Sequence, residues 1–400
     1  MLRIVFVTGS LAHGGAERHS ITLMNRLAER GHECHAVYVK NDPSQLGRIE
    51  LRSNGSVRCL DAARFFDWHA MAEFAAHLDC IQPELIVAAN GYALMYASVA
   101  RRLSRLRVPL LATFHSTRLL GLKERVKMLV DRFFFLSADC LIFVCENQRR
   151  YWQRRGLIAR RTEVIHNGID ADHFSAGGFR DESALVRHAH GFTETDYVIG
   201  ISAVLREEKN HVQLVDAVAA LHDTGIMARL LVIGDGPMRQ AVEARAQQLR
   251  GDTDIRITGF RQEVRPFIAA CDVMVICSIA VETFSLAALE AMAMGKPVVH
   301  SDVGGAAEMI TPGINGFLFR AGDTKALVQH LATLADRKRA VAMGHNARRV
   351  VEQRFTEAVM VDRYEKALLS LCQAHSKSSN ENRHAQHRLV GQQEQSSVKE

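Results

Sequence analysis

Short apolar runs alternate along this chain with longer segments whose apolar residues recur at helical spacing. Runs of four to eight apolar residues between turn residues are typical of buried strands. Strands that alternate with helices indicate parallel sheets covered on both faces, so the pattern predicts a doubly wound α/β protein. The predicted strands are Arg3–Thr8, Cys34–Val39, Leu85–Ala89, Pro109–Phe114, Cys140–Val144, Glu163–His166, Tyr197–Ser202, Arg229–Gly234, Ile255–Thr258, Val273–Cys277, Pro297–Ser301 and Gly316–Phe319.

The alternation lapses once in the middle of the chain and once near its end. A chain of 400 residues is long enough for two domains. The central lapse, around SAGGFRDES, predicts a linker between them, and the Gln-, Ser- and Asn-rich end predicts a disordered tail. The predicted units are a first domain at 1–175, a linker at 176–194, a second domain at 195–355, a closing helix at 356–373 and a tail at 374–400.

The most informative segment is VETFSLAALEAMAMGKPVV, which places Glu282 and Glu290 eight residues apart. Glu290 falls two turns into a predicted helix, where a buried carboxylate needs a polar partner. The helix start near Phe284 and Ser285 offers free N–H groups and a positive dipole end, which suit a phosphate. One glutamate beside an anion site and another that reaches sugar hydroxyls fit a nucleotide-sugar pocket. The flanking sequences disfavour the alternative of two solvated glutamates on an amphipathic helix.

Two further motifs narrow the chemistry. The first loop, GSLAHGGAE, has neither the G-x-G-x-x-G order of a dinucleotide site nor the GK[ST] of a P-loop. Its Gly14 and Gly15 allow backbone N–H groups to approach a ligand at the start of the next helix. The segments Asp170–Asp172 and Asp252–Asp254 have D-x-D spacing but lie in turn-like segments, so no catalytic metal and no cofactor are expected.

Six segments occur in one order along the chain: HGGAE, VIHNGID, LREEKN, VIGDGP, the E-x7-E helix and GGAAEMI. In this order they resemble the retaining glycosyltransferases of family 4. The resemblance implies the GT-B fold, in which two Rossmann-like, doubly wound domains face a cleft and a C-terminal helix crosses back to the first domain. It also implies transfer of a sugar from a nucleotide diphosphate donor, here expected to be UDP-linked, to a glycan or lipid-linked saccharide during cell-surface polysaccharide synthesis.

The resemblance assigns roles residue by residue. It implies catalytic roles for His115, Lys209 and Glu282, with Glu308 near the nucleotide. The donor-binding residues it implies are Gly15, Lys209, Glu282, Thr283, Phe284, Ser285, Leu286 and Glu290, and the acceptor-binding residues are Gly14, Glu17 and His115. Two positions depart from the family pattern. Val204 stands where an arginine is usual, and we expect Arg206 to bind the donor by supplying the missing charge. Thr283 replaces a usual glycine. If a positive φ were needed there, threonine would be strained, so we expect either a differently built loop or a narrower sugar pocket.

Charge and hydropathy bear on partners and location. The net charge is +6, and residues 101–161 hold 15 basic residues against 4 acidic ones. No nucleic-acid motif accompanies this surplus, so an anionic membrane surface is the expected partner. The N-terminus predicts a first strand and not a signal peptide, which favours a cytoplasmic protein, peripheral at the inner face of the membrane. Two alternatives stay open: a nucleotide-sugar epimerase on the same fold, and a non-catalytic subunit that binds a sugar nucleotide.

Overall fold

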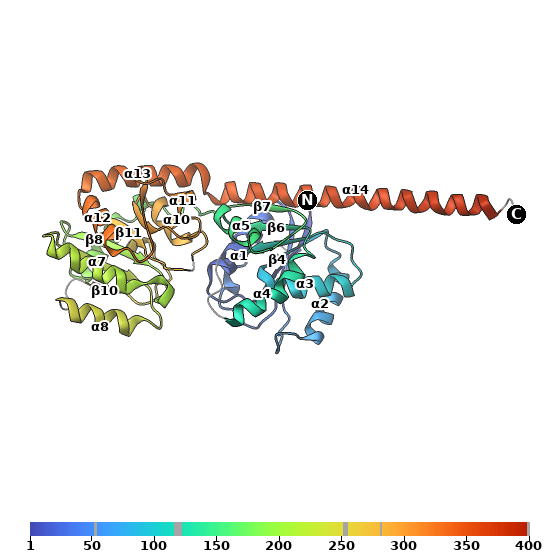
Figure 1. Ribbon diagram of the computed structural model, residues 1–400, viewed down its shortest axis with the longest axis horizontal. Helices are drawn as coiled ribbons and strands as arrows, with labels where there is room; N and C mark the ends of the chain where they lie inside the picture. The colour runs from blue at the N-terminus through green and yellow to red at the C-terminus, as the bar shows by residue number, and fades with distance from the viewer. Residues whose placement is uncertain (52–53, 116–121, 251–254, 281, 398–400) are drawn as a thin grey trace.

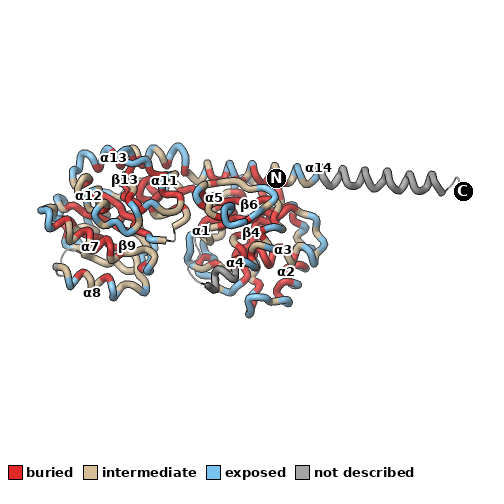
Figure 2. Tube along the Cα trace, viewed as in Figure 1, coloured by how far each residue is buried: buried red, intermediate tan, exposed pale blue. Residues whose placement is uncertain are grey.

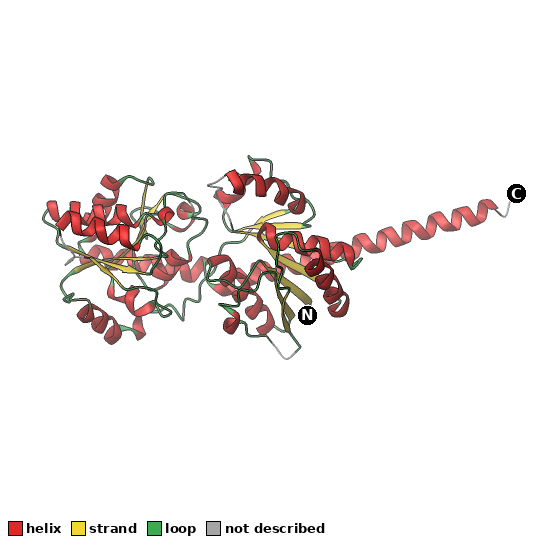
Figure 3. Cartoon of the chain, turned by 90° about the horizontal axis from the view of Figure 1, so that it is seen from below, coloured by secondary structure: helices red, strands yellow, loops and turns green. Residues whose placement is uncertain are grey.

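The structure, a computed structural model, forms two lobes that lie side by side and are joined along one edge by the last two helices (Figure 1). It describes residues 1–51, 54–115, 122–250, 255–280 and 282–397, without the side chains of residues 122–127, 130, 176, 250 and 378–397. In each lobe the strands lie between helices on both sides (Figure 3). The doubly wound α/β architecture predicted from the sequence is therefore confirmed.

The N-terminal lobe contains a seven-stranded parallel sheet in the order β3-β2-β1-β4-β5-β6-β7. Its inner strands are apolar along their whole length because helices cover both faces. The strands are β1 (Arg3–Thr8), β2 (Glu33–Tyr38), β3 (Ser56–Cys59), β4 (Leu85–Ala89), β5 (Leu110–Phe114), β6 (Cys140–Phe143) and β7 (Thr162–Val164). The helices are α1 (Gly15–Glu29), η1 (Leu46–Arg48), α2 (Trp68–Ile81), α3 (Asn90–Leu103), α4 (Leu122–Phe135) and α5 (Glu146–Gln153).

The C-terminal lobe contains a six-stranded parallel sheet in the order β10-β9-β8-β11-β12-β13. Its strands are β8 (Tyr197–Ser202), β9 (Ala228–Ile233), β10 (Ile255–Ile257), β11 (Val273–Ile276), β12 (Val298–Ser301) and β13 (Gly316–Phe319). Its helices are η2 (Ala176–Gly178), α6 (Arg180–Ala189), η3 (Glu207–Lys209), α7 (His211–Asp223), α8 (Arg239–Arg250), α9 (Arg265–Ala270), α10 (Leu286–Ala293), α11 (Ala306–Met309), α12 (Thr324–Leu334) and α13 (Arg337–Arg354). The segment predicted as a linker contains α6, so it is not irregular throughout.

The last helix, α14 (Glu357–Ser397), crosses back to the N-terminal lobe as predicted. Its apolar residues Met360, Val361, Tyr364 and Leu368 complete a core whose other members include Ile4 and Leu27 (Figure 2). The helix continues to Ser397, whereas the sequence predicted a disordered tail from residue 374. The composition that suggested disorder contains no proline and only one glycine beyond residue 374, so no residue forces the helix to end there.

The chain crosses between the lobes twice, and the two crossings lie side by side. Ile169, on the way out, forms a parallel bridge with Thr356, on the way back. The Ile169 N–H donates to Phe355 O at 2.9 Å, and the Glu357 N–H donates to Ile169 O at 2.9 Å. A side chain at Gly168 would collide with the backbone of Thr356, so this close approach depends on glycine.

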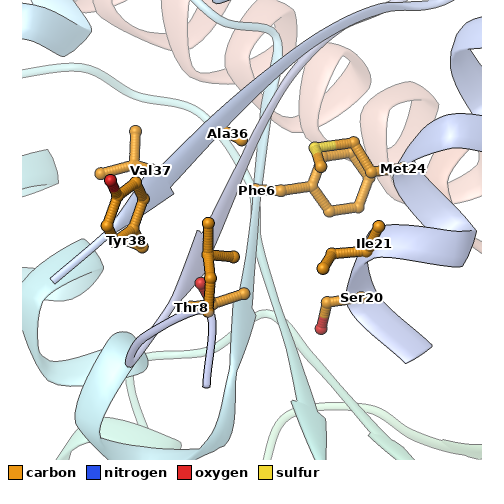
Figure 4. Close-up of a pocket in the computed structure, with 9 residues that line it drawn as sticks. Phe6, Thr8, Ser20, Ile21, Met24, Ala36, Val37 and Tyr38 are labelled. Carbon is orange, nitrogen blue, oxygen red and sulfur yellow. The ribbon is translucent and has the colours of Figure 1, made fainter. Parts of the chain in front are cut away.

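An apolar cavity lies inside the N-terminal lobe, between α1 and strands β1 and β2 (Figure 4). Ile21 and Met24 of α1 face Phe6 and Ala36 of the strands across it. Its lining consists mainly of apolar side chains of the domain core and contains no charged side chain. The functional site therefore has to be sought elsewhere.

Candidate functional site

A polar pocket opens where the C-terminal sheet reverses its strand order. The chain winds from β8 through β9 to β10 on one side, then from β11 to β13 on the other, so β8 and β11 flank the switch point. Open parallel sheets bind ligands at this place, beyond the carboxyl ends of the strands. The pocket is lined by Ile201, Ser202, Ala203, Lys209, Ile276, Cys277, Ser278, Glu282, Ser285 and Ala287.

An ion pair between Lys209 and Glu282 lies in this pocket. Lys209 ends the short helix η3, and its Nζ lies 2.7 Å from Glu282 Oε2, which also accepts from Ser278 Oγ at 3.0 Å. Burial alone raises the pKa of the Glu282 carboxyl, but Lys209 and His300 outweigh it, so that pKa is lowered. The site therefore presents an ionised carboxylate and an ammonium group side by side, both predicted from the sequence.

Glycines hold the loop that carries Glu282 in place. Gly304 adopts a φ of +61°, and a side chain there would collide with the carbonyl oxygens of Glu282 and Thr283. The next residue, Gly305, donates its N–H to Thr283 O at 2.7 Å. The GGAAE loop thus stacks on the backbone of the E-x7-E loop, which explains why the GGAAE loop has glycine at the contact.

Thr283 adopts an ordinary backbone conformation, because it is not among the described non-glycine residues with positive φ. A positive φ, which would strain threonine, is therefore absent, and the loop tolerates a residue other than glycine; the narrower sugar pocket stays a prediction. The Thr283 hydroxyl donates to His115 O at 2.8 Å, and Cys145 Sγ donates to Thr283 O at 3.4 Å. Thr283 consequently links the two lobes at the base of the cleft.

Helix α10 begins directly beside the pocket. Ser285 caps it by accepting from the Ala288 N–H at 3.3 Å. The Phe284 ring points away into the core, 4.8 Å from the His166 ring, so Phe284 can serve a ligand only through its backbone. Leu286 lies across the cleft from Gly15, whose added Cβ would be 3.8 Å from Leu286 Cδ1. The N-termini of α10 and α1 therefore meet in the cleft.

The start of α1 is exposed and glycine-rich. Gly14, the residue before the helix, has no side chain that could cap the first N–H groups of α1. The carboxylate of Glu17 lies over this helix start, so close that a side chain at Gly14 would collide with it. Burial raises the pKa of Glu17. These three predicted residues, Gly14, Gly15 and Glu17, do gather at one edge of the cleft.

Glu290 does not face an open pocket. It is buried on α10, and its Oε1 lies 2.6 Å from Nη1 of Arg18 in the first turn of α1. The polar partner that this carboxylate required therefore comes from the other lobe. Sequence reasoning missed Arg18, although it directly follows the HGGAE motif.

His115 directly follows strand β5 and is half-buried beneath the cleft. Desolvation of the ring lowers its pKa to about 4, so the ring is neutral at physiological pH. Its Nε2 has no hydrogen-bond partner among the described residues. The ring packs edge-on against His19 at 4.7 Å, and His19 Nε2 lies 3.1 Å from the hydroxyl of Tyr364 on α14. Sequence reasoning missed His19 and Tyr364 as neighbours of His115.

Two predicted residues lie apart from the ion pair. The Arg206 side chain is 60% exposed and approaches the Glu208 carboxylate only at 4.0 Å. Glu308 accepts from His166 Nε2 at 2.8 Å and from the Glu146 and Asn147 N–H groups at 2.9 Å each. Glu308 thus binds the start of α5 across the lobe boundary, a contact that no sequence signal indicated.

Among the described residues, no cluster of three or more His, Cys, Asp and Glu side chains could hold a metal ion. Asp170, in one of the D-x-D segments, accepts from the Asp172 and His173 N–H groups, as a turn residue does. Within the same part of the chain, no helix combines the length and the apolar composition needed to span a bilayer.

Comparisons with known proteins agree with this geometry. The family model described as Glycosyltransferase Family 4 matches residues 13–173, and that described as Glycosyl transferases group 1 matches residues 183–350. The chain belongs to glycosyltransferase family 4. The Glycosyltransferase Family 4 model thus matches the N-terminal lobe, and the Glycosyl transferases group 1 model matches the C-terminal lobe.

Individual relatives support the same placement. EpsD of Bacillus subtilis, named as a glycosyltransferase, is 30% identical over 58% of this chain and 61% of its own length, so the match covers less than two thirds of that relative. N-acetyl-alpha-D-glucosaminyl L-malate synthase of Bacillus anthracis is 26% identical over 88% of this glycosyltransferase and 93% of its own length. The crystal structure of Anabaena HepE in complex with UDP superposes with a TM-score of 0.80 at 22% identity, covering 92% of this chain and all of HepE, and confirms the GT-B fold.

Proposed function

We propose that this glycosyltransferase moves a sugar, with retention of configuration, from a UDP-linked donor to a glycan or lipid-linked saccharide in polysaccharide synthesis. The observation that carries the proposal is the Lys209–Glu282 ion pair beside the start of α10, at the switch point of the C-terminal sheet. A diphosphate placed there meets the N-termini of two helices and an ammonium group. The Anabaena HepE structures, which hold UDP and UDP-glucose, support the choice of nucleotide.

Each group has a task in the proposed transfer. Negative charge grows on the leaving phosphate as the glycosidic bond breaks, and the fixed Lys209 cation stabilises it. Glu282 is held by Lys209 and Ser278, so we assign it to the hydroxyls of the donor sugar and not to nucleophilic attack. The neutral His115 ring has an unused Nε2 that can bond a sugar hydroxyl. The acceptor then attacks from the face that the phosphate leaves, with that phosphate taking the acceptor proton.

This mechanism needs no metal, because protein cations take the role that a divalent ion has in other transferases. The decisive test is a panel of nucleotide sugars offered with and without saccharide acceptors, in the presence of EDTA. We expect nucleotide release only when an acceptor is present. An epimerase would convert the donor sugar without acceptor, and a non-catalytic subunit would bind the nucleotide without releasing product, so either result would replace the proposal.

We also propose that the N-terminal lobe docks on an anionic membrane, where a lipid-linked acceptor would be found. Helix α4 exposes Leu129 and Phe133, and Leu136 directly after the helix is also exposed; the exposed fraction of Phe133 is 75%. These residues lie within the basic segment 101–161. Apolar side chains flanked by basic ones are typical of helices that lie in a membrane interface. The side chains of Lys123, Arg125 and Lys127, which the sequence predicted as contacts, lie outside the described residues.

Replacing Leu129 and Phe133 together with serine is expected to reduce co-sedimentation with acidic vesicles at least fivefold, because burial of each large apolar side chain contributes roughly 1.5–3 kcal/mol. Wild-type binding should also weaken as salt rises to ~0.15 M, where the screening length is about 8 Å. The matched control is Ile158→Ser, which alters an exposed apolar residue outside α4. Vesicle binding that ignores both salt and the double substitution would rule out docking through this face.

A further inference from the structure

Arg18 reaches across the cleft from one lobe to the other. It lies in the first turn of α1, and this helix lies on the side of the N-terminal lobe that faces the C-terminal lobe (Figure 1). Its guanidinium is one third exposed and pairs with the nearly buried carboxylate of Glu290 at 2.6 Å. The same helix turn begins at Gly15, opposite Leu286 at the start of α10. Arg18 therefore lies where two helix N-termini converge and where the proposed diphosphate binds.

Among its described residues, the C-terminal lobe places one cation in the lining of the pocket. Lys209 is fixed there by Glu282, whereas the neighbouring loop carries Val204 and the exposed Arg206, whose guanidinium is loosely associated with Glu208 at 4.0 Å. A diphosphate that leaves with growing negative charge is stabilised best by more than one fixed donor, and a guanidinium can bind phosphate oxygens through two parallel bonds. A second cation is therefore needed, and Arg18 is the arginine that the structure presents at the cleft.

We propose that Arg18 is the second cation of the donor diphosphate, held in reserve by Glu290 until the donor binds. This inference rests on the proposed function. When the ribose hydroxyls bind the Glu290 carboxylate, they displace the guanidinium, which then turns to the diphosphate. Neither charged group is left without a partner. The Glu290 carboxylate accepts hydrogen bonds from the ribose hydroxyls in place of Arg18, and the Arg18 guanidinium binds phosphate in place of Glu290. Because Arg18 belongs to the N-terminal lobe, donor binding also draws that lobe onto the nucleotide.

The exchange predicts opposite effects on two related ligands. Uridine has the ribose but no phosphate, so it must compete with Arg18 for Glu290 and gains nothing from the released cation. UDP also competes with Arg18 for Glu290, but its diphosphate then binds the released Arg18 cation. Removing the guanidinium should therefore weaken UDP and leave uridine unchanged or bound more tightly. If Arg18 only held the two lobes together, its removal would change the affinities for UDP and uridine equally.

The test measures binding of UDP and uridine by calorimetry to the full chain and to Arg18→Ala, Arg18→Lys, Arg206→Ala and Glu290→Gln. Charge-assisted hydrogen bonds contribute about 1.5–3 kcal/mol, so Arg18→Ala should weaken UDP about tenfold to a hundredfold. Arg18→Lys should lie between it and the wild type, because lysine keeps the charge but not the planar fork. Glu290→Gln should weaken both ligands through the ribose. The matched control is Arg363→Ala, an exposed arginine on α14.

Each result of the binding measurements leads to a different conclusion about Arg18. Equal weakening of UDP and uridine by Arg18→Ala would make Arg18 a structural brace and overturn the inference. Unchanged UDP binding in Arg18→Ala, with a UDP-specific loss in Arg206→Ala, would assign the second cation to Arg206. In either case the wild type still binds UDP and the proposed function stands. A wild type that does not bind UDP would overturn the proposed UDP-linked donor, and the inference with it.

Discussion

Replacing Lys209 with alanine is expected to reduce sugar transfer by about 10²- to 10³-fold, the range seen when one donor to a developing negative charge is removed. The loss should fall mainly on kcat, because the contact strengthens as the phosphate departs. It also leaves the Glu282 carboxylate, 12% exposed, with Ser278 but without its cation. The measurement is steady-state transfer from the donor identified in the panel.

A folded mutant is the necessary control for this result. Lys209 is partly exposed at the end of a short helix, so the circular dichroism of Lys209→Ala should stay close to that of the wild type. Its melting temperature should fall, because the nearly buried Glu282 carboxylate loses its cation. Lys209→Arg keeps a cation and should retain more activity than Lys209→Ala. Turnover of Lys209→Ala within a fewfold of the wild type would remove Lys209 from the mechanism.

Replacing Tyr364 with alanine is expected to lower the free energy of unfolding by about 3–5 kcal/mol, as large-to-small changes at fully buried aromatic residues do. Tyr364 lies on α14 but is buried in the core of the N-terminal lobe. Its hydroxyl also bonds His19, which packs against His115. The loss should therefore appear both in chemical denaturation and in the orientation of the His115 ring.

Two substitutions on the same helix separate packing from hydrogen bonding. Tyr364→Phe keeps the ring and removes only the bond to His19, so it should cost about 1–3 kcal/mol for the buried partner left unpaired. Leu369→Ala, at a side chain that is 37% exposed, should cost far less than Tyr364→Ala. A Tyr364→Ala protein as stable as Leu369→Ala would show that α14 does not support the N-terminal lobe.

Local pattern was enough to predict most of the fold and part of the site. Buried parallel strands are apolar along their length and alternate with helices, so their positions were visible in the sequence. Lys209 and Glu282 were found because each follows a strand end in a recognisable motif, and the structure pairs them at 2.7 Å. The role of each predicted site residue stays a prediction.

Contacts between distant segments could not be predicted in this way. Arg18 and Glu290 lie on different lobes, and His19 and Tyr364 are separated by 345 residues. Periodicity describes one element at a time and says nothing about which polar groups meet when two lobes close. The same limit applies to Thr283, where glycine is usual. Its hydroxyl donates to His115 O of the other lobe, a contact that the sequence pattern does not indicate.

The crossing helix also sets the order in which the newly made chain can fold. The core of the N-terminal lobe begins at Leu2 but contains Leu371, so it stays incomplete until nearly the whole protein has been synthesised. At roughly 5–20 residues per second, the interval between Ser175 and Leu371 lasts on the order of 10–40 s. During that time the apolar face that α14 will cover is open to solvent, and the C-terminal lobe can finish first. The first domain on the ribosome is therefore the last to complete its core.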